Sequence, residues 1–224
     1  MRNTFDRFNG RHQDYQAARP SYAQEFLDWL GELYAPPERY TAADIGSGTG
    51  KLSAQLLAAG FRVCGVEPNP DMRGAAEALL GGDPRFSSSN GTDHDTGLPD
   101  RSVDMVAAAQ AFHWFDGPAF ARECRRILRP GGRAVLVWNV RGSAPMNQAL
   151  AQVFREHCPS FHGFTGGMGE DDPRIRDFFG GAYEKRRFPN PLTLDRDRFL
   201  RRCFSSSYAL REGDADYEAF RAAL

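Results

Sequence analysis

Short apolar runs alternate along the first 140 residues with stretches in which apolar residues recur at helical spacing. Such runs are typical of buried strands, and the stretches between them are typical of amphipathic helices. The runs are residues 40–45, 61–66, 85–89 (the weakest), 102–109 and 133–140. This alternation predicts an α/β fold: a doubly wound, mostly parallel sheet with helices on both faces and ligands at the carboxyl ends of the strands.

Helical spacing also predicts the elements around these runs. Ser21 is expected to cap a helix with apolar residues on one face, which ends before Pro36. Further helices are expected at residues 52–59, 71–80, 118–128, 146–158, 173–179, 196–204 and 216–224. Asp116 and Asp195 stand at the starts of two of them. Residues 183–188 are a candidate strand.

We interpret residues 1–224 as a single domain. Residues 1–36 form an N-terminal helical arm, residues 40–140 a cofactor-binding core, and residues 141–224 a cap over the substrate, where the strand–helix alternation stops. Residues 1–20 are polar with spaced aromatic rings. They are either a frayed arm or a flap that closes over the cofactor.

A glycine-rich turn follows the first apolar run. Gly46, Gly48 and Gly50 stand at alternate positions, so the backbone can turn tightly and a ligand can lie against main-chain N–H groups at a helix start. Asp44 precedes the turn, where a carboxylate suits a ligand with a cationic end. Glu67 ends the second run, where an acid can accept both hydroxyls of a ribose. S-adenosylmethionine, an adenosine with an amino-acid end, fits both acids.

Two other classes of function stay open. The dinucleotide fingerprint is G-x-G-x-x-G, but here the third glycine comes one position early, at Gly50. The spacing and Asp44 therefore argue against a nicotinamide-dependent oxidoreductase. A non-catalytic S-adenosylmethionine-binding protein would keep the cofactor half and lose the acceptor pocket.

The composition of the chain bears on which classes of binding partner are expected. Apolar residues make up 41% of the chain, charged residues 25%, and the net charge is −1, so no attraction to nucleic acid or to a membrane is implied. No apolar run approaches a membrane span, and residues 1–10 lack the apolar core of a signal peptide. We therefore expect a cytoplasmic protein. The four cysteines lie far apart and the five histidines are scattered, which favours reduced core thiols and no metal site.

Several motifs occur together along the chain. They are Phe5-Asp6 with Tyr15, Arg19-Pro20 and Tyr22; residues 44–50; residues 65–68; Gly91-Thr92 with Leu98-Pro99; residues 109–114; and residues 128–132. This set resembles the class I S-adenosylmethionine-dependent methyltransferases, in the small-molecule branch close to trans-aconitate-type enzymes. The resemblance implies a Rossmann-like sheet, methyl transfer and a small-molecule acceptor. We expect a monomer or a weak homodimer.

The resemblance also implies a cofactor-binding set. Asp44 and the glycine backbone would hold the methionine end, and Glu67 would take the ribose hydroxyls. Met72 would pack on the adenine, with Thr92 and Asp93 at its edge. His94 stands where relatives usually have glutamate. The whole implied set is Tyr15, Arg19, Asp44, Gly46, Ser47, Gly48, Glu67, Pro68, Met72, Thr92, Asp93 and Ala109.

The acceptor is expected beside the end of the fourth run. His113 is the candidate base, needed only if the acceptor arrives protonated; alternatively its ring packs beside Trp114 and orders the loop. Arg141 could pair with an acceptor carboxylate or be a solvated charge at the rim. The expected substrate-binding set is Phe112, His113, Trp114, Asn139 and Arg141. The acceptor itself and the methylated atom stay open.

The C-terminal pattern gives one more expectation. Sheets of the resembled class usually have seven strands, the last antiparallel and inserted beside the fifth. After residue 195 the pattern is helical to Leu224, so we expect this sequence to stop before that strand and the natural chain to continue. The alternatives are that another segment or a neighbouring chain covers the open edge of the fifth strand.

Overall fold

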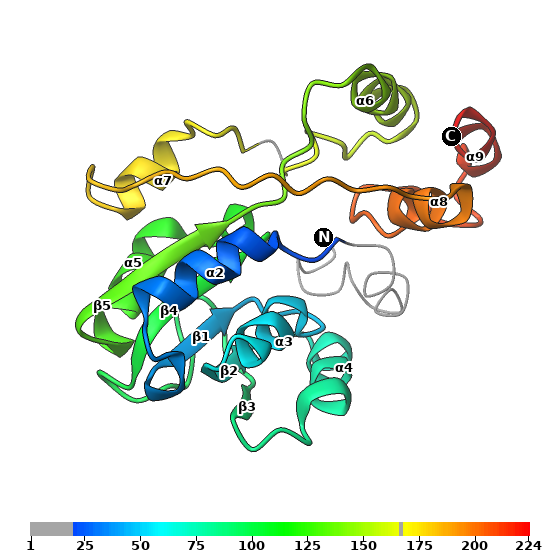
Figure 1. Ribbon diagram of the computed structural model, residues 1–224. Helices are drawn as coiled ribbons and strands as arrows, with labels where there is room; N and C mark the ends of the chain where they lie inside the picture. The colour runs from blue at the N-terminus through cyan, green and yellow to red at the C-terminus, as the bar shows by residue number, and fades with distance from the viewer. Residues whose placement is uncertain (1–19, 166–167) are drawn as a thin grey trace.

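The computed structural model describes residues 20–165 and 168–224, and Figure 1 shows how the elements are arranged. Its strands form one sheet in the order β3-β2-β1-β4-β5, and every neighbouring pair is parallel. The predicted α/β fold is therefore confirmed. The strands are β1 (Thr41–Ile45), β2 (Arg62–Val66), β3 (Phe86–Ser89), β4 (Val103–Ala109) and β5 (Leu128–Val137).

The helices lie where helical spacing predicts them, with ends that shift by a few residues. Asp116 and Asp195 are N-caps as expected, because their carboxylates accept the N–H groups of Ala119 and Arg198. The helices are α2 (Gln24–Leu33), α3 (Lys51–Ala58), α4 (Pro70–Leu80), α5 (Gly117–Ile127), α6 (Pro145–His157), α7 (Pro173–Phe178), α8 (Arg196–Phe204) and α9 (Tyr217–Ala223). The 3-10 turns are η2 (Pro37–Arg39) and η3 (Phe112–Trp114).

Both faces of the sheet are buried, because alternate side chains of its central strands enter two different apolar clusters. Ile45 and Val106 pack in the cluster that includes α5 and α7. Ala42 and Met105 pack in the cluster that includes α2 and α3. Figure 1 shows α2 and α5 on opposite sides of the sheet. Double-sided burial explains why the strands are continuous apolar runs rather than alternating ones.

β5 differs from its predicted bounds at both ends. It begins at Leu128 rather than Arg133 and ends at Val137 rather than Val140. Val103 faces Leu128, but Met105 faces Arg133, so the residues between are accommodated as an irregularity in the ladder. The turn motif at residues 129–132 therefore interrupts the strand instead of preceding it.

Two expectations outside the core are wrong. α2 begins at Gln24 with Ala23 as its N-cap and no side-chain cap bond, so Ser21 does not cap it. Residues 183–188 form no strand and run as an extended segment between α7 and α8 (Figure 1). Lys185 pairs with Glu170 at 3.0 Å, and Phe188 packs against α2. These side-chain contacts hold the segment in place of a strand ladder.

The region after β5 forms a third apolar cluster. Helices α6, α8 and α9 surround the buried rings of Phe154 and Phe220. Figure 1 shows these helices grouped beyond the ends to which the strand arrows point. They lie where the cap is expected, and the division of the chain into arm, core and cap stays a prediction.

Two other features bear on the sequence expectations. All four cysteines are buried and none forms a disulfide. None of the described helices has both the length and the apolar character that a membrane span requires.

Candidate functional site

The glycine turn connects β1 to α3 at the carboxyl edge of the sheet. Gly46, Gly48 and Gly50 have φ values of +69°, +58° and +78°, a region that residues with a Cβ avoid. A Cβ on Gly46 would lie 2.8 Å from that of Ala111, so this glycine also permits close contact with the loop after β4. The Gly46 N–H donates to the Val66 carbonyl at 2.8 Å. This bond ties the turn to the end of β2.

Asp44 lies in β1 directly before the turn and is 1% exposed. Its Oδ2 accepts the Ser53 hydroxyl at 2.7 Å, while its Oδ1 is buried with no hydrogen-bond partner in the described part of the chain. Burial raises the pKa of Asp44 to about 6, against opposing hydrogen bonds from Ser53. A buried acceptor without a donor is costly, so this oxygen fits a cationic, hydrogen-bonding ligand group.

Glu67 follows β2 and faces the same turn. Its Oε2 accepts the Gly48 N–H and its Oε1 accepts the Asn69 N–H, both at 2.9 Å. Burial raises the pKa of Glu67, although these two backbone donors oppose the rise. Each carboxylate oxygen has two lone pairs, so both retain capacity for another donor such as a ribose hydroxyl.

Met72 lies at the start of α4, next to the turn. Asn69 caps this helix, because its Oδ1 accepts the Met72 N–H at 3.0 Å. The Met72 side chain is buried, and its sulfur lies 3.9 Å from where a Cβ on Gly48 would stand. Pro68, between Glu67 and the cap, is half-buried. The second strand end thus brings Glu67, Pro68 and Met72 to the glycine turn.

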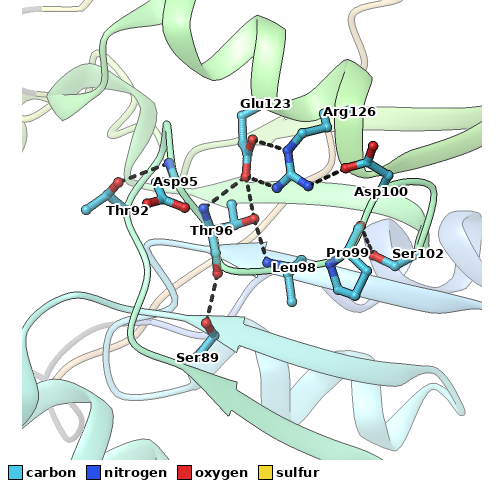
Figure 2. A network of polar contacts seen from close by, with 10 residues as sticks. All are labelled: Ser89, Thr92, Asp95, Thr96, Leu98, Pro99, Asp100, Ser102, Glu123 and Arg126. Carbon is cyan, nitrogen blue, oxygen red and sulfur yellow. Dashed lines mark hydrogen bonds and ion pairs between the residues drawn. The ribbon is translucent and has the colours of Figure 1, made fainter.

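The loop after β3 carries Thr92, labelled in Figure 2, and the next residue, Asp93. Thr92 Oγ1 accepts the Asp95 N–H at 3.1 Å, and Asp93 Oδ2 accepts the N–H of Asp116 at the start of α5. His94 is more than half exposed and lies 3.1 Å from the other Asp93 oxygen. The loop is therefore fastened to α5.

A pocket opens over the glycine turn and extends to the region after β5. The lining residues that the sequence predicts are Asp44, Gly46, Ser47, Gly48, Ala109, Asn139 and Arg141. Glu67, Pro68, Met72, Thr92, Asp93 and the residues of η3 do not line it. Tyr15 and Arg19 lie outside the described residues.

Sequence reasoning missed the far wall of this pocket. Phe164, Arg202 and Tyr208 line it from the region after β5. The Arg141 guanidinium lies 4.1 Å from the centre of the Phe164 ring, a cation–π distance. Burial raises the pKa of Cys203 to about 11, and the charges of Arg141 and Arg202 oppose this rise. No periodic pattern or motif marks these positions.

Gln110 is a second missed residue, at the end of β4. Its φ is +55°, in the left-handed region, and its side chain lines the pocket. Its N–H donates to the Val137 carbonyl at 2.8 Å, and its Nε2 donates to the Asn139 carbonyl at 3.2 Å. Strained backbone of this kind is often kept where it positions functional groups.

The three residues of η3 differ in burial and in the side chains that they contact, although the sequence predicts that all three bind the substrate. Phe112 is 2% exposed and packs among Phe115, Phe120 and Phe178 in the core. The His113 ring lies 4.8 Å from that of Trp114, and its Nδ1 is buried. Trp114 is 37% exposed. The structure therefore places Phe112 in the packing of α5 rather than in the pocket wall.

The core of the chain matches known proteins. Residues 43–136 match the family described as a methyltransferase domain. An uncharacterized methyltransferase of Mycobacterium tuberculosis is 42% identical over 127 residues, which are 57% of this chain and 49% of the relative. An uncharacterized methyltransferase-like protein of Schizosaccharomyces pombe is 32% identical over 153 residues, 66% of this chain and 59% of that relative. The chain spans about half the length of these curated relatives.

Solved structures extend the likeness to the fold. A putative type II methyltransferase from Anaeromyxobacter dehalogenans has a TM-score of 0.59 at 29% identity, over 92% of this chain and 88% of that chain. A putative S-adenosylmethionine-dependent methyltransferase from Methanococcus maripaludis shares the fold, with a TM-score of 0.57 at 20% identity, over 80% of this chain and 85% of that chain. The matched domain and the Anaeromyxobacter neighbour support a class I methyltransferase domain, a class that implies the use of S-adenosylmethionine.

Proposed function

We propose that the protein transfers a methyl group from S-adenosylmethionine to a small-molecule acceptor, as an enzyme of the trans-aconitate-type branch. The observation that carries this proposal is the buried Asp44 oxygen without a partner, beside a turn of three left-handed glycines. The ammonium group of an amino-acid ligand would satisfy that oxygen. Glu67, at the next strand end, retains acceptors for a ribose. The residues present therefore fit this cofactor.

The chain's own residues would bind and orient the cofactor. When bound, S-adenosylmethionine supplies a methyl group on a sulfonium that is already activated for in-line displacement. In our proposal Asp44 and the backbone of residues 46–48 hold the methionine end, and Glu67 holds the ribose. Met72 packs on the adenine, with Thr92 and Asp93 at its edge. Tyr15 and Arg19, outside the described residues, are proposed for the carboxylate.

The acceptor would lie against the opposite wall of the pocket. Asn139 and Arg141 follow β5 and line the same space as the glycine turn, so they can orient an acceptor toward a methyl group held there. Arg141 offers forked N–H donors that suit a carboxylate or phosphate. Phe164 and Tyr208 supply ring surface that displaces water from the acceptor side.

His113 has two possible roles in this scheme. As a base it would take a proton from the acceptor; otherwise its ring packs on Trp114 and orders η3. A His113→Gln variant separates them. If His113 is the base, the variant should lose the acidic limb of the pH profile of kcat, and kcat itself should fall strongly. If the His113 ring only packs, the pH profile of the variant should match that of the wild type.

Two experiments test the proposed function. Calorimetry with S-adenosylhomocysteine and with NAD separates a methyltransferase from an oxidoreductase, since only the first ligand should bind. A metabolite pool with a labelled methyl donor, read by mass spectrometry, should then yield a labelled product. Binding without transfer to any acceptor, polycarboxylic acids included, would favour the non-catalytic binding protein.

A further inference from the structure

The loop at residues 90–100 is fastened to α5 by one buried residue pair (Figure 2). Thr96 is fully buried and Glu123 is 6% exposed. Glu123 Oε1 accepts both the Thr96 N–H at 2.9 Å and the Thr96 hydroxyl at 2.5 Å. Two donors from one residue on one oxygen fix the position and the rotation of Thr96 together.

Arg126 holds the acceptor of this pair in place. Its Nε donates to Glu123 Oε2 at 2.8 Å and its Nη2 to Glu123 Oε1 at 2.7 Å, a forked arrangement that fixes the carboxylate plane. Its Nη1 donates to Asp100 at 2.7 Å. Although burial alone would raise the pKa of Glu123, bonds from Arg126 and Thr96 lower it to about 2. Glu123 is therefore a charged acceptor throughout the usual pH range.

The remaining polar groups of Thr96 bind the rest of the loop. Its carbonyl accepts the Ser89 hydroxyl at the end of β3 at 2.8 Å, and its Oγ1 accepts the Leu98 N–H at 3.2 Å. A Cβ on Gly91 would lie 2.5 Å from the Thr96 carbonyl oxygen, so the two limbs of the loop are in direct contact. Every polar atom of Thr96 is thus engaged.

This loop lies next to the proposed ribose site. Arg73 links the two, because its Nη1 donates to the Glu67 carbonyl at 2.8 Å and to Asn90 Oδ1 at 2.9 Å. Thr92 and Asp93 are the next loop residues after Gly91, and Asp93 is also tied to α5 through the Asp116 N–H. Small movements of Thr96 would therefore displace the groups that meet a purine edge.

We propose that Thr96 and Glu123 are positioning residues that set the selectivity of the site for adenine. The inference rests on the proposed function. In the proposed complex the pair holds the loop so that the Asp93 carboxylate, whose Oδ2 already accepts the Asp116 N–H, also accepts from the 6-amino group of adenine and repels the 6-oxo group of hypoxanthine. Discrimination of this kind depends on polar groups that cannot move to suit the wrong ligand.

The test compares S-adenosylhomocysteine with S-inosylhomocysteine by calorimetry on the full chain. The wild type should prefer the adenosyl ligand by about tenfold or more, the scale of one hydrogen bond. Thr96→Val removes the hydroxyl and keeps the shape, and it should abolish most of this preference while affinity for the inosyl ligand changes by less than about twofold. Thr96→Ser keeps the hydroxyl and should retain the preference.

Asp100→Ala is the matched control, because it removes the outer acceptor of Arg126 without touching Thr96. Its preference should equal that of the wild type. If Thr96→Val fails to fold, Thr96→Ala, which also removes the hydroxyl, makes the same comparison.

An unchanged preference in a folded Thr96→Val variant would overturn the inference, as would equal weakening of both ligands or an equal effect in Asp100→Ala. Failure of the wild type to bind either ligand would overturn the proposed function itself.

Discussion

Replacing Asp44 by asparagine should stabilise the ligand-free protein while weakening cofactor binding. The substitution keeps an oxygen for the Ser53 hydroxyl, which donates to Asp44 at 2.7 Å. It removes the charge and replaces the other carboxylate oxygen by an amide NH2 group. A buried charge without a partner disfavours folding, and Asp44 Oδ1 is buried without one in the described residues. A group that binds the ligand at the expense of stability is common in functional sites.

The size and sign of the effect follow from the pKa. Burial raises the pKa of Asp44 from 3.8 to about 6, and each pH unit corresponds to roughly 1.4 kcal/mol. Below the unfolded-state pKa the carboxyl is protonated in both states and carries no penalty. As the pH rises through about 6, the folded state must hold the charge, and stability falls by up to about 3 kcal/mol. The asparagine variant avoids this fall.

Urea unfolding of both proteins between pH 4 and pH 8, without ligand, measures the difference. The two free energies of unfolding should coincide near pH 4 and separate as the pH rises to about 6. Above that pH the difference should stay constant, with the variant about 3 kcal/mol more stable at pH 8. Ser53→Ala removes a hydrogen bond that lowers the pKa, so its loss of stability should extend to higher pH. Parallel curves for wild type and Asp44→Asn, or a variant that is less stable at pH 8, would refute the reasoning.

Three further substitutions test other parts of the site. Glu67→Ala should weaken S-adenosylhomocysteine binding by on the order of 2 kcal/mol, since charge-assisted hydrogen bonds are lost; unchanged affinity by calorimetry would remove Glu67 from the site. Gly46→Ala should lower the free energy of unfolding by about 1–3 kcal/mol, because φ is +69° and the new Cβ would lie 2.8 Å from that of Ala111. The control is Gly74→Ala in α4, where the space around the glycine is open; this variant should be neutral or stabilising in thermal melts. Arg141→Leu should raise KM for the acceptor by about tenfold and leave cofactor affinity within about twofold, and a loss of cofactor affinity instead would contradict an acceptor role.

The glycine-turn side of the candidate site could be predicted because the residues that form it are local in sequence. Asp44 and Glu67 each stand at the end of an apolar run, and parallel strands bring such ends to one edge. β1 and β2 are neighbours in the sheet, so the two acids meet at the turn between them. The glycine spacing marks the turn itself, and three left-handed φ values explain why those positions are glycines.

The acceptor side could not be predicted in the same way. Tyr208 reaches the pocket because its ring contacts Phe154 and Phe161, which are far away in the sequence. Phe164 contacts the same two rings from the loop that follows α6. Such contacts leave no periodic pattern. Contacts between distant residues also explain two errors of the sequence prediction. The predicted start of β5 is misplaced because its register depends on pairing with β4. The strand predicted at residues 183–188 is absent, and Lys185 in this segment pairs instead with residues 170 and 171.

The boundary of the family match falls between these two sides. The matched segment ends at residue 136, and the acceptor-side lining begins at Asn139 and continues through Arg141 to Tyr208. The family match therefore covers the glycine turn and ends before the opposite pocket wall. A pocket wall built on its own apolar cluster can change its lining without disturbing the glycine turn, because the two are held by separate contacts. The acceptor must accordingly be found by experiment on this chain, starting from ligands that Arg141 and its aromatic neighbours can bind.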